Sequence, residues 1–252
     1  MNISIEHDIE LPMMQAGTRC TARALLSPRD LSTQKIGAWE IGGSAFSDAT
    51  PIVDAFGNLS HLVTFFAGDT ASALKIKGEV TTTDRDAIVG RIPNEPTPVL
   101  FKRMTAETPS TQFTYGVARG LRASEESTLE CLHQALARVH ERATSTPQDG
   151  EADLEPADNV HAFLAICRTI GVPARFVSGY VANETETQMH AWAEAWDDNL
   201  GWIGFDPTLG LCPSDAHVGV AVGLDATTTN PLRLQPIPGE DSKISMAIHI
   251  GQ

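Results

Sequence analysis

The stretch that decides the fold is HAFLAICRTIGVPARFVSGYV at residues 161–181, followed by HAWAEAW at 190–196 and GWIGFDPT at 201–208. The first block predicts a helix and then a strand. Pro156 suits the first turn of this helix and Gly171 suits its C-terminal cap. Apolar side chains recur along one helix face at the required spacing: Val160, Phe163, Leu164, Cys167 and Ile170.

The second and third blocks predict a β-hairpin. The segment DDNLG at 197–201 is a plausible tight turn, which sets Trp196 opposite Trp202. Continuing this register places His190 and Asp206 on one face of the sheet as diagonal neighbours, roughly 7–8 Å apart at the backbone. We therefore expect the imidazole of His190 to reach the carboxylate of Asp206.

The rest of the chain predicts an α+β fold. Several short strands of alternating polarity fill the first hundred residues, and the Pro-rich stretch 91–99 follows them. The spacing of Ser127 and Glu130 then predicts a capped helix ahead of the helix at 156–170. We expect an antiparallel, sandwich-like β domain at 1–100 and a core of helices packed on an antiparallel sheet at 101–252.

Charge and composition exclude several classes of function. The 18 Lys and Arg residues against 32 Asp and Glu residues give a net charge of −14, which argues against nucleic acid and anionic lipid as partners. No apolar run reaches the roughly 18 residues that a membrane span needs. The acidic start does not resemble a signal peptide, and the four cysteines are scattered. We therefore expect a cytoplasmic protein with reduced thiols, and exposed strand edges make a homodimer plausible.

The three blocks together resemble the bacterial transglutaminase-like family, whose core is shared with papain-type cysteine proteases. Further segments resemble the same family. Residues 27–29 (SPR) with Gln34, and DAFGN at 54–58, are similar to its N-terminal β domain. HVGVAVGLD at 217–225, with Pro231 after it, is similar to its C-terminal segment.

The resemblance implies a cysteine, a histidine and an aspartate that act together on amide bonds. A thiolate attacks the carbonyl, the histidine transfers the proton and the aspartate orients the imidazole. His190 matches the histidine of this triad and Asp206 the aspartate. The family's nucleophile stands five residues before the histidine that corresponds to His161, and that position is Pro156 in this chain.

The helix start at 156 is also an unfavourable place for a thiolate. Four carboxylates crowd it in the sequence, those of Glu151, Asp153, Glu155 and Asp158, and they would repel another anion. The sequence therefore predicts a pseudoenzyme of the transglutaminase-like class that binds a peptide or a protein and needs no cofactor. In such a protein the pair of His190 and Asp206 would be an inherited structural hydrogen bond.

Two alternatives retain catalysis. In the first, the protein is an active cysteine protease or acyltransferase that uses His190, Asp206 and a displaced nucleophile, for which Cys212 is the best candidate. In the second, His190, Asp206 and His217 bind a metal ion that supports hydrolysis. Cys167 and His161 are expected to be a buried, inert thiol and a packing residue of the helix.

Overall fold

The computed structural model describes residues 1–11, 15–43, 49–67, 73–124, 126–145, 156–182, 189–237 and 245–251. It contains a 3-10 helix, η1 (Pro98–Lys102), and the helices α1 (Gln112–Ala123), α2 (Thr128–Thr144) and α3 (Pro156–Thr169). Its strands are β1 (Asn2–Glu10), β2 (Arg19–Ser27), β3 (Gln34–Gly42), β4 (Ile52–Val53), β5 (Leu59–Phe66), β6 (Ala73–Thr82), β7 (Ile88–Gly90), β8 (Ala174–Val181), β9 (His190–Asp197), β10 (Gly201–Phe205), β11 (His217–Gly223), β12 (Leu232–Gln235) and β13 (Ser245–Gly251).

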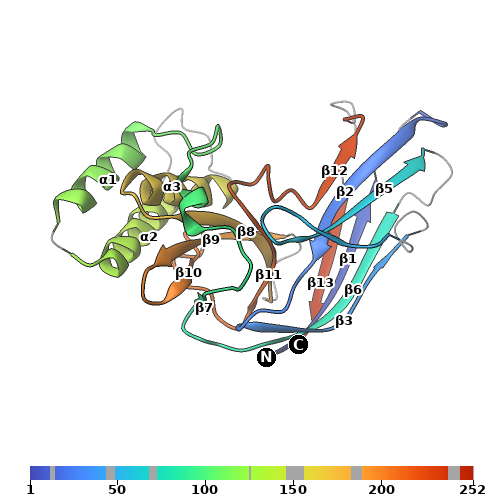
Figure 1. The fold of residues 1–252 in the computed structure, drawn as a ribbon, viewed down its shortest axis with the longest axis horizontal. Coiled ribbons are helices and arrows are strands. Elements are labelled where there is room, and N and C mark those ends of the chain that lie inside the picture. Colours follow the sequence, from blue (N-terminus) through green and yellow to red (C-terminus); the bar gives the residue numbers. More distant parts are fainter. Residues whose placement is uncertain are drawn as a thin grey trace.

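The helical half of the molecule is built on a five-stranded antiparallel sheet with the order β11-β8-β9-β10-β7. All three α-helices lie on the same side of the molecule, away from the β-sandwich (Figure 1). The core between helices and sheet is formed by apolar side chains such as Leu132, Val160, Phe163, Phe176 and Phe205. This arrangement confirms the predicted α+β class with helices packed on an antiparallel sheet.

The β-sandwich consists of two four-stranded sheets with the orders β13-β1-β6-β3 and β12-β2-β5-β4. Alternation along β1 buries every second side chain, as the sequence pattern predicts. These side chains meet those of the other sheet in an apolar core that contains Ile9, Ala22, Leu26 and Leu74.

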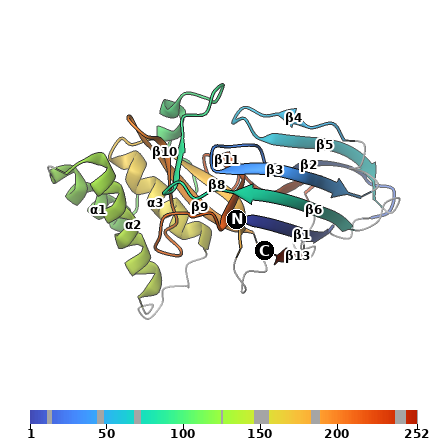
Figure 2. The same cartoon turned by 90° about the horizontal axis from the view of Figure 1, so that it is seen from below.

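The division of the chain between the two halves differs from the expected boundary at residue 100. The last two strands, β12 and β13, pair with β2 and β1 of the sandwich, and Figure 2 shows β13 beside β1. In return, β7 pairs with β10 of the core sheet. The physical reason is that edge strands are satisfied by pairing wherever a free edge is near, regardless of their distance along the chain.

The helix α1 was not expected from the sequence. Two glycines, Gly116 and Gly120, lower its intrinsic helix propensity. Its start is fixed by a capping box in which the side chains of Thr111 and Thr114 each accept from the other's backbone N–H. The buried face of α1 packs on α3 and α2 through Ala118, so tertiary burial compensates for the weak propensity.

The Pro-rich stretch at 91–99 is anchored to the core by a buried ion-pair network. Arg175 of β8 donates to Glu194 at 2.7 Å and to Glu95 of this stretch at 2.8 Å. Glu95 also pairs with Arg29, the last residue of the SPR segment. The guanidinium of Arg175 lies 4.1 Å from the ring centroid of Trp202, so the network is covered by aromatic surface.

The outer edge of β11 is satisfied by amide side chains of the sandwich. Gln34 accepts from the N–H of Gly219 at 2.9 Å and donates to the carbonyl of the same residue at 2.8 Å. Asn58 makes the equivalent pair of bonds to Val222, both at 2.8 Å. A bulge between Gly219 and Ala221 turns both residues toward the same edge, because residues three apart face opposite edges in a regular strand.

The segment DAFGN at 54–58 forms the turn that positions Asn58. Asp54 accepts from the backbone N–H groups of Phe56 and Asn58, and its second oxygen accepts from the Asn58 amide at 3.1 Å. Gly57 has φ +84°, and a Cβ at this residue would lie 2.8 Å from the guanidinium of Arg29. The positive φ favours glycine here, and a Cβ would also require the Arg29 guanidinium to shift. The two N-terminal segments singled out from the sequence therefore join the sandwich to the core.

Candidate functional site

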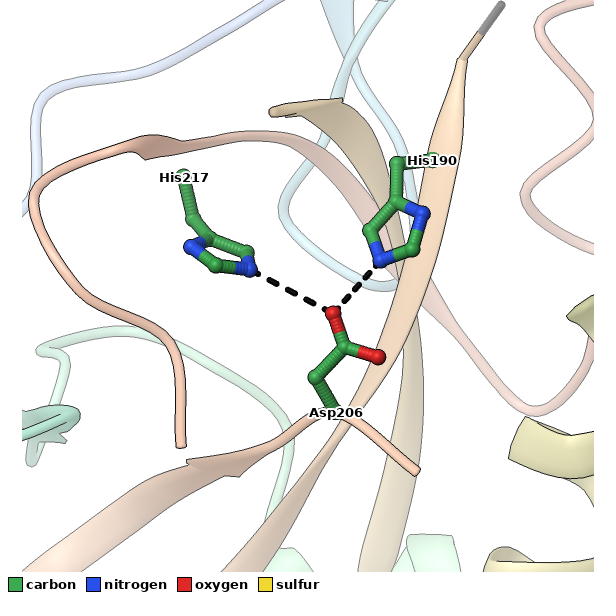
Figure 3. A group of neighbouring side chains, drawn as sticks. All are labelled: His190, Asp206 and His217. Atoms are coloured by element: carbon green, nitrogen blue, oxygen red, sulfur yellow. Dashed lines mark hydrogen bonds and ion pairs between the residues drawn. The ribbon is translucent and has the colours of Figure 1, made fainter. Parts of the chain in front are cut away.

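Three side chains from the ends of three strands meet at one end of the core sheet. His190 opens β9, Asp206 follows the last residue of β10 and His217 opens β11. The hairpin register that brings the first two together is the predicted one, with Trp196 opposite Trp202. Figure 3 shows both imidazole rings pointing at the Asp206 carboxylate.

One oxygen of Asp206 accepts hydrogen bonds from both histidines. Its Oδ2 lies 2.5 Å from Nε2 of His190 and 3.3 Å from Nε2 of His217. An ionised carboxylate can only accept, so each histidine must carry a proton on Nε2. The predicted contact between His190 and Asp206 is present, and His217 is a second donor to the same oxygen.

The other oxygen of Asp206 holds the turn that follows the strand. Its Oδ1 accepts from the backbone N–H of Thr208 at 3.1 Å and from that of Leu209 at 3.0 Å. Burial of Asp206 by itself would raise the pKa of the carboxyl, but the bonds from His190 and His217 outweigh it and lower the pKa to about 2. The group is therefore a carboxylate at neutral pH.

Trp192 covers both histidines on this face of the sheet. Its ring centroid lies 6.3 Å from that of His190 and 5.3 Å from that of His217. The indole crosses over Gly179 of β8, where a Cβ would lie 2.7 Å from the ring. Glycine at this position thus leaves the space that Trp192 needs, a requirement that only the strand pairing reveals.

Among the described residues, no hydrogen bond joins a cysteine to His190, Asp206 or His217. Cys20, Cys131 and Cys167 are buried, and burial raises the pKa of the Cys167 thiol as expected for an inert group. Cys212 is half-buried and packs against the apolar core on the helix side. Burial raises the pKa of its thiol too, which is unfavourable for a nucleophile.

The helix α3 begins at Pro156, as the sequence predicts. Asp158 lies in its first turn and is exposed, whereas Glu151, Asp153 and Glu155 are outside the described residues. His161 packs 5.2 Å from the Phe176 ring and its Nε2 accepts from the N–H of Ala226 at 3.1 Å.

A metal ion is disfavoured at this cluster by the direction of one hydrogen bond. The ligand atoms of His190, Asp206 and His217 do lie within 4.8 Å of one another. A metal bound at Nε2 of His217 would require its proton on Nδ1. The backbone N–H of Ser214 donates to that Nδ1 at 3.3 Å, so Nδ1 is an acceptor and carries no proton. The tautomer that results donates to Asp206.

Space beside the cluster is limited on the sandwich side. A cavity of about 40 Å³ is lined by Trp192 and His217 on the core side and by Gln34 on the sandwich side. A water molecule needs about 10–15 Å³ by this measure, so the cavity has room for a few waters.

The part of the chain that contains the histidine–aspartate pair is similar to a known family. Residues 112–207, from α1 to the DPT segment, match the transglutaminase-like superfamily. The matched range contains His190 and Asp206 and excludes His217.

Several known proteins are similar to the chain. It is 36% identical over 84 residues to an uncharacterized protein of Mycobacterium leprae, a match that covers 30% of this chain and 29% of that protein. A protein-glutamine gamma-glutamyltransferase of Pseudomonas aeruginosa is 29% identical over 94 residues, which are 31% of this chain and 14% of that enzyme. The matched segments thus span less than a third of these relatives.

A solved structure of similar fold covers the whole chain. It is that of a candidate cysteine protease from Cytophaga hutchinsonii, with a TM-score of 0.74 and 16% identity, covering 100% of this chain and 90% of that one. The likeness therefore includes the sandwich as well as the helical half. Within the residues that the structure describes, no helix is long and apolar enough to cross a membrane.

Proposed function

We propose that this protein is a non-catalytic relative of the transglutaminases and cysteine proteases that binds a peptide or a protein. The observation that carries the proposal is the start of α3 at Pro156, the position that the family resemblance assigns to the nucleophile. Proline has no nucleophilic atom, and a histidine–aspartate pair without a nucleophile performs no acyl transfer.

The environment of the pair supports a structural role. Both Nε2 protons bind Asp206, and Trp192 lies over the rings. The alternative with Cys212 as nucleophile is less favoured, because its thiol packs with the helix-side core and burial raises its pKa. The four free cysteines are consistent with the reducing cytoplasm, which belongs to the same proposal.

The variant Pro156→Cys tests the proposal directly. We expect the wild-type protein to show no amide hydrolysis or amine incorporation with a glutamine-containing peptide. Pro156→Cys places a thiol at the helix start, where the helix dipole lowers a thiol pKa and the flanking carboxylates raise it. Because the carboxylates oppose a thiolate, we expect Pro156→Cys to be labelled by iodoacetamide no faster than the half-buried Cys212 and to show no turnover. Labelling sites are identified by mass spectrometry of the digested protein.

The matched controls are Pro156→Ser, which lacks a thiol, and Pro156→Cys combined with His190→Ala. Turnover by the wild-type protein that His190→Ala abolishes would refute the proposal. If Cys212→Ser abolished that turnover as well, the displaced nucleophile would be identified.

A further inference from the structure

A second cavity, of about 320 Å³, lies between the three α-helices. It is lined by the start of α1, the C-terminal half of α2 and the first two turns of α3. None of its lining residues belongs to the cluster around Asp206. Its volume is at the lower end of the range for ligand sites, which suits one small molecule better than a peptide.

The floor of this cavity has unused hydrogen-bonding atoms. Asn159 is 4% exposed and its Oδ1 has no hydrogen-bond partner within the described chain. His161 is 7% exposed, and its Nε2 accepts from the N–H of Ala226. Burial lowers the pKa of His161, so the neutral ring carries its proton on Nδ1. The floor thus offers one acceptor and one donor.

The lining of the cavity carries one basic side chain, Arg142, and two acidic ones, Glu107 and Asp158. Arg142 of α2 lies over the ring of Phe113, with its guanidinium 4.6 Å from the ring centroid, and it forms no ion pair with another described residue. Glu107 and Asp158 are both exposed. After burial, the charge of Glu107 has the largest effect on the pKa of His161, and Asp158 acts on it in the same direction.

We propose that this cavity binds a small zwitterion of the amino-acid class, with one carboxylate and one ammonium group. The carboxylate accepts from Arg142 and from Nδ1–H of His161, and the ammonium donates to Oδ1 of Asn159 and to Glu107. A simple anion would face Glu107 and Asp158 and would leave Asn159 without a donor. A simple cation would face Arg142. A zwitterion satisfies both sets of groups.

Isothermal titration calorimetry of the full chain tests this proposal. Glycine, L-alanine and L-serine are the probes, and acetate and methylamine are their single-charge counterparts. We expect saturable binding of at least one of the amino acids, with at least tenfold weaker binding of acetate and methylamine. The absence of saturable binding by all three amino acids at millimolar concentration would overturn the proposal, as would equal binding of acetate.

Two variants assign the binding to this cavity. Arg142→Gln should weaken it at least tenfold, as expected for the loss of a charge-assisted hydrogen bond. The matched control is Arg138→Gln, one turn earlier on α2, where the side chain is 65% exposed and pairs with Glu141. Asn159→Leu should also weaken binding while leaving the melting temperature unchanged or higher, because its oxygen has no bond to lose.

Equal affinity in Arg142→Gln and Arg138→Gln would show that the amino acid binds elsewhere and would refute the assignment. The result is independent of the proposed loss of catalysis, because Pro156→Cys changes neither Arg142 nor Asn159. A protein that proves to be an active enzyme could still bind glycine here, and an inactive one could fail to.

Discussion

Asp206 is the residue on which the candidate site depends. Its two oxygens accept four N–H groups, those of Thr208, Leu209, His190 and His217. The backbone bonds fix the DPT turn and the side-chain bonds fix both rings. One carboxylate therefore couples the local chain path to the position of two histidines from other strands.

Asp206→Asn should consequently destabilise the protein although it changes one atom. Asparagine has one acceptor oxygen and one donor amide, so two of the four N–H groups would face another donor. We expect the free energy of unfolding to fall by about 2–4 kcal/mol, since hydrogen bonds to charged groups contribute about 1.5–3 kcal/mol each. Urea unfolding at pH 7 measures this change.

His249→Gln, on the exposed side of β13, is the control and should change the unfolding free energy by less than about 0.5 kcal/mol. If Asp206→Asn were equally neutral, the four-bond description of this carboxylate would be wrong.

The sequence predicts part of this site well. The contact between His190 and Asp206 follows from one tight turn, because the position of the turn fixes which residues are paired along the whole hairpin. The position of His217 depends on the pairing of β11 with β8 across a bulge, which no local pattern encodes. The hydrogen bond from Ser214 that sets the tautomer of His217 is a backbone contact and has no signature in the residue types.

At the level of elements, the edge of β11 shows how the two halves are joined. Gln34 and Asn58 replace a neighbouring strand with two amide side chains, each bonded to both backbone groups of one residue. Backbone groups at a buried edge must be satisfied, so these amides are part of the sheet in energetic terms.

Asn58→Asp should weaken this join. The carboxylate still accepts from the N–H of Val222, but it can no longer donate to the Val222 carbonyl and it faces the carboxylate of Asp54. We expect a loss of about 1–3 kcal/mol in the free energy of unfolding and faster amide exchange in β11. Hydrogen exchange followed by mass spectrometry measures the latter.

The matched control is Asn230→Asp. The Asn230 side chain is exposed and accepts from the N–H of Leu232 at 3.0 Å, which a carboxylate does equally well. Similar losses for both variants would mean that the Asn58 amide does not satisfy the edge of β11.

The strands with strict alternation were predictable because a local pattern encodes them, and the helix α1 was not predictable because its local pattern is weak. In β1 the burial pattern repeats every second residue, so the sequence alone reveals the element. In α1 the residues Gly116 and Gly120 oppose the helix, and packing against α3 stabilises it. Where long-range packing outweighs local preference, a single sequence carries little signal.

For the whole molecule, His7 links the stability of both halves to pH. It lies on β1 and its Nδ1 is 2.9 Å from the hydroxyl of Tyr180 on β8. Burial lowers the pKa of His7 from 6.5 to about 4. Above pH 6.5 the ring is neutral in both the folded and the unfolded chain. Below it, the unfolded chain binds a proton that the folded protein excludes.

The free energy of unfolding should therefore fall as the pH decreases from 6.5 to about 4. One group of this kind contributes about 1.4 kcal/mol per pH unit, or roughly 3 kcal/mol in total. Urea unfolding at several pH values between 7 and 4.5 measures the slope. His7→Gln should reduce this slope by the contribution of about one proton, roughly 1.4 kcal/mol per pH unit. The exposed His249→Gln should leave the slope unchanged.

Burial also lowers the pKa values of His61 and His161, so some pH dependence should persist in His7→Gln. Asp206 acts in a lower range, because its pKa of about 2 makes its contribution disappear only as the pH falls below 3.8. An unchanged slope in His7→Gln would show that the pKa of His7 does not differ between the folded and the unfolded chain.

The pairing of β1 with β13 has a consequence for how the protein is made. Residues 2–10 leave the ribosome long before their partner strand at 245–251. Until then one side of β1 is open, with its N–H and carbonyl groups available to any other extended chain. Premature termination upstream of residue 245 would leave that edge permanently exposed, so such a product is expected to be retained by chaperones or to aggregate.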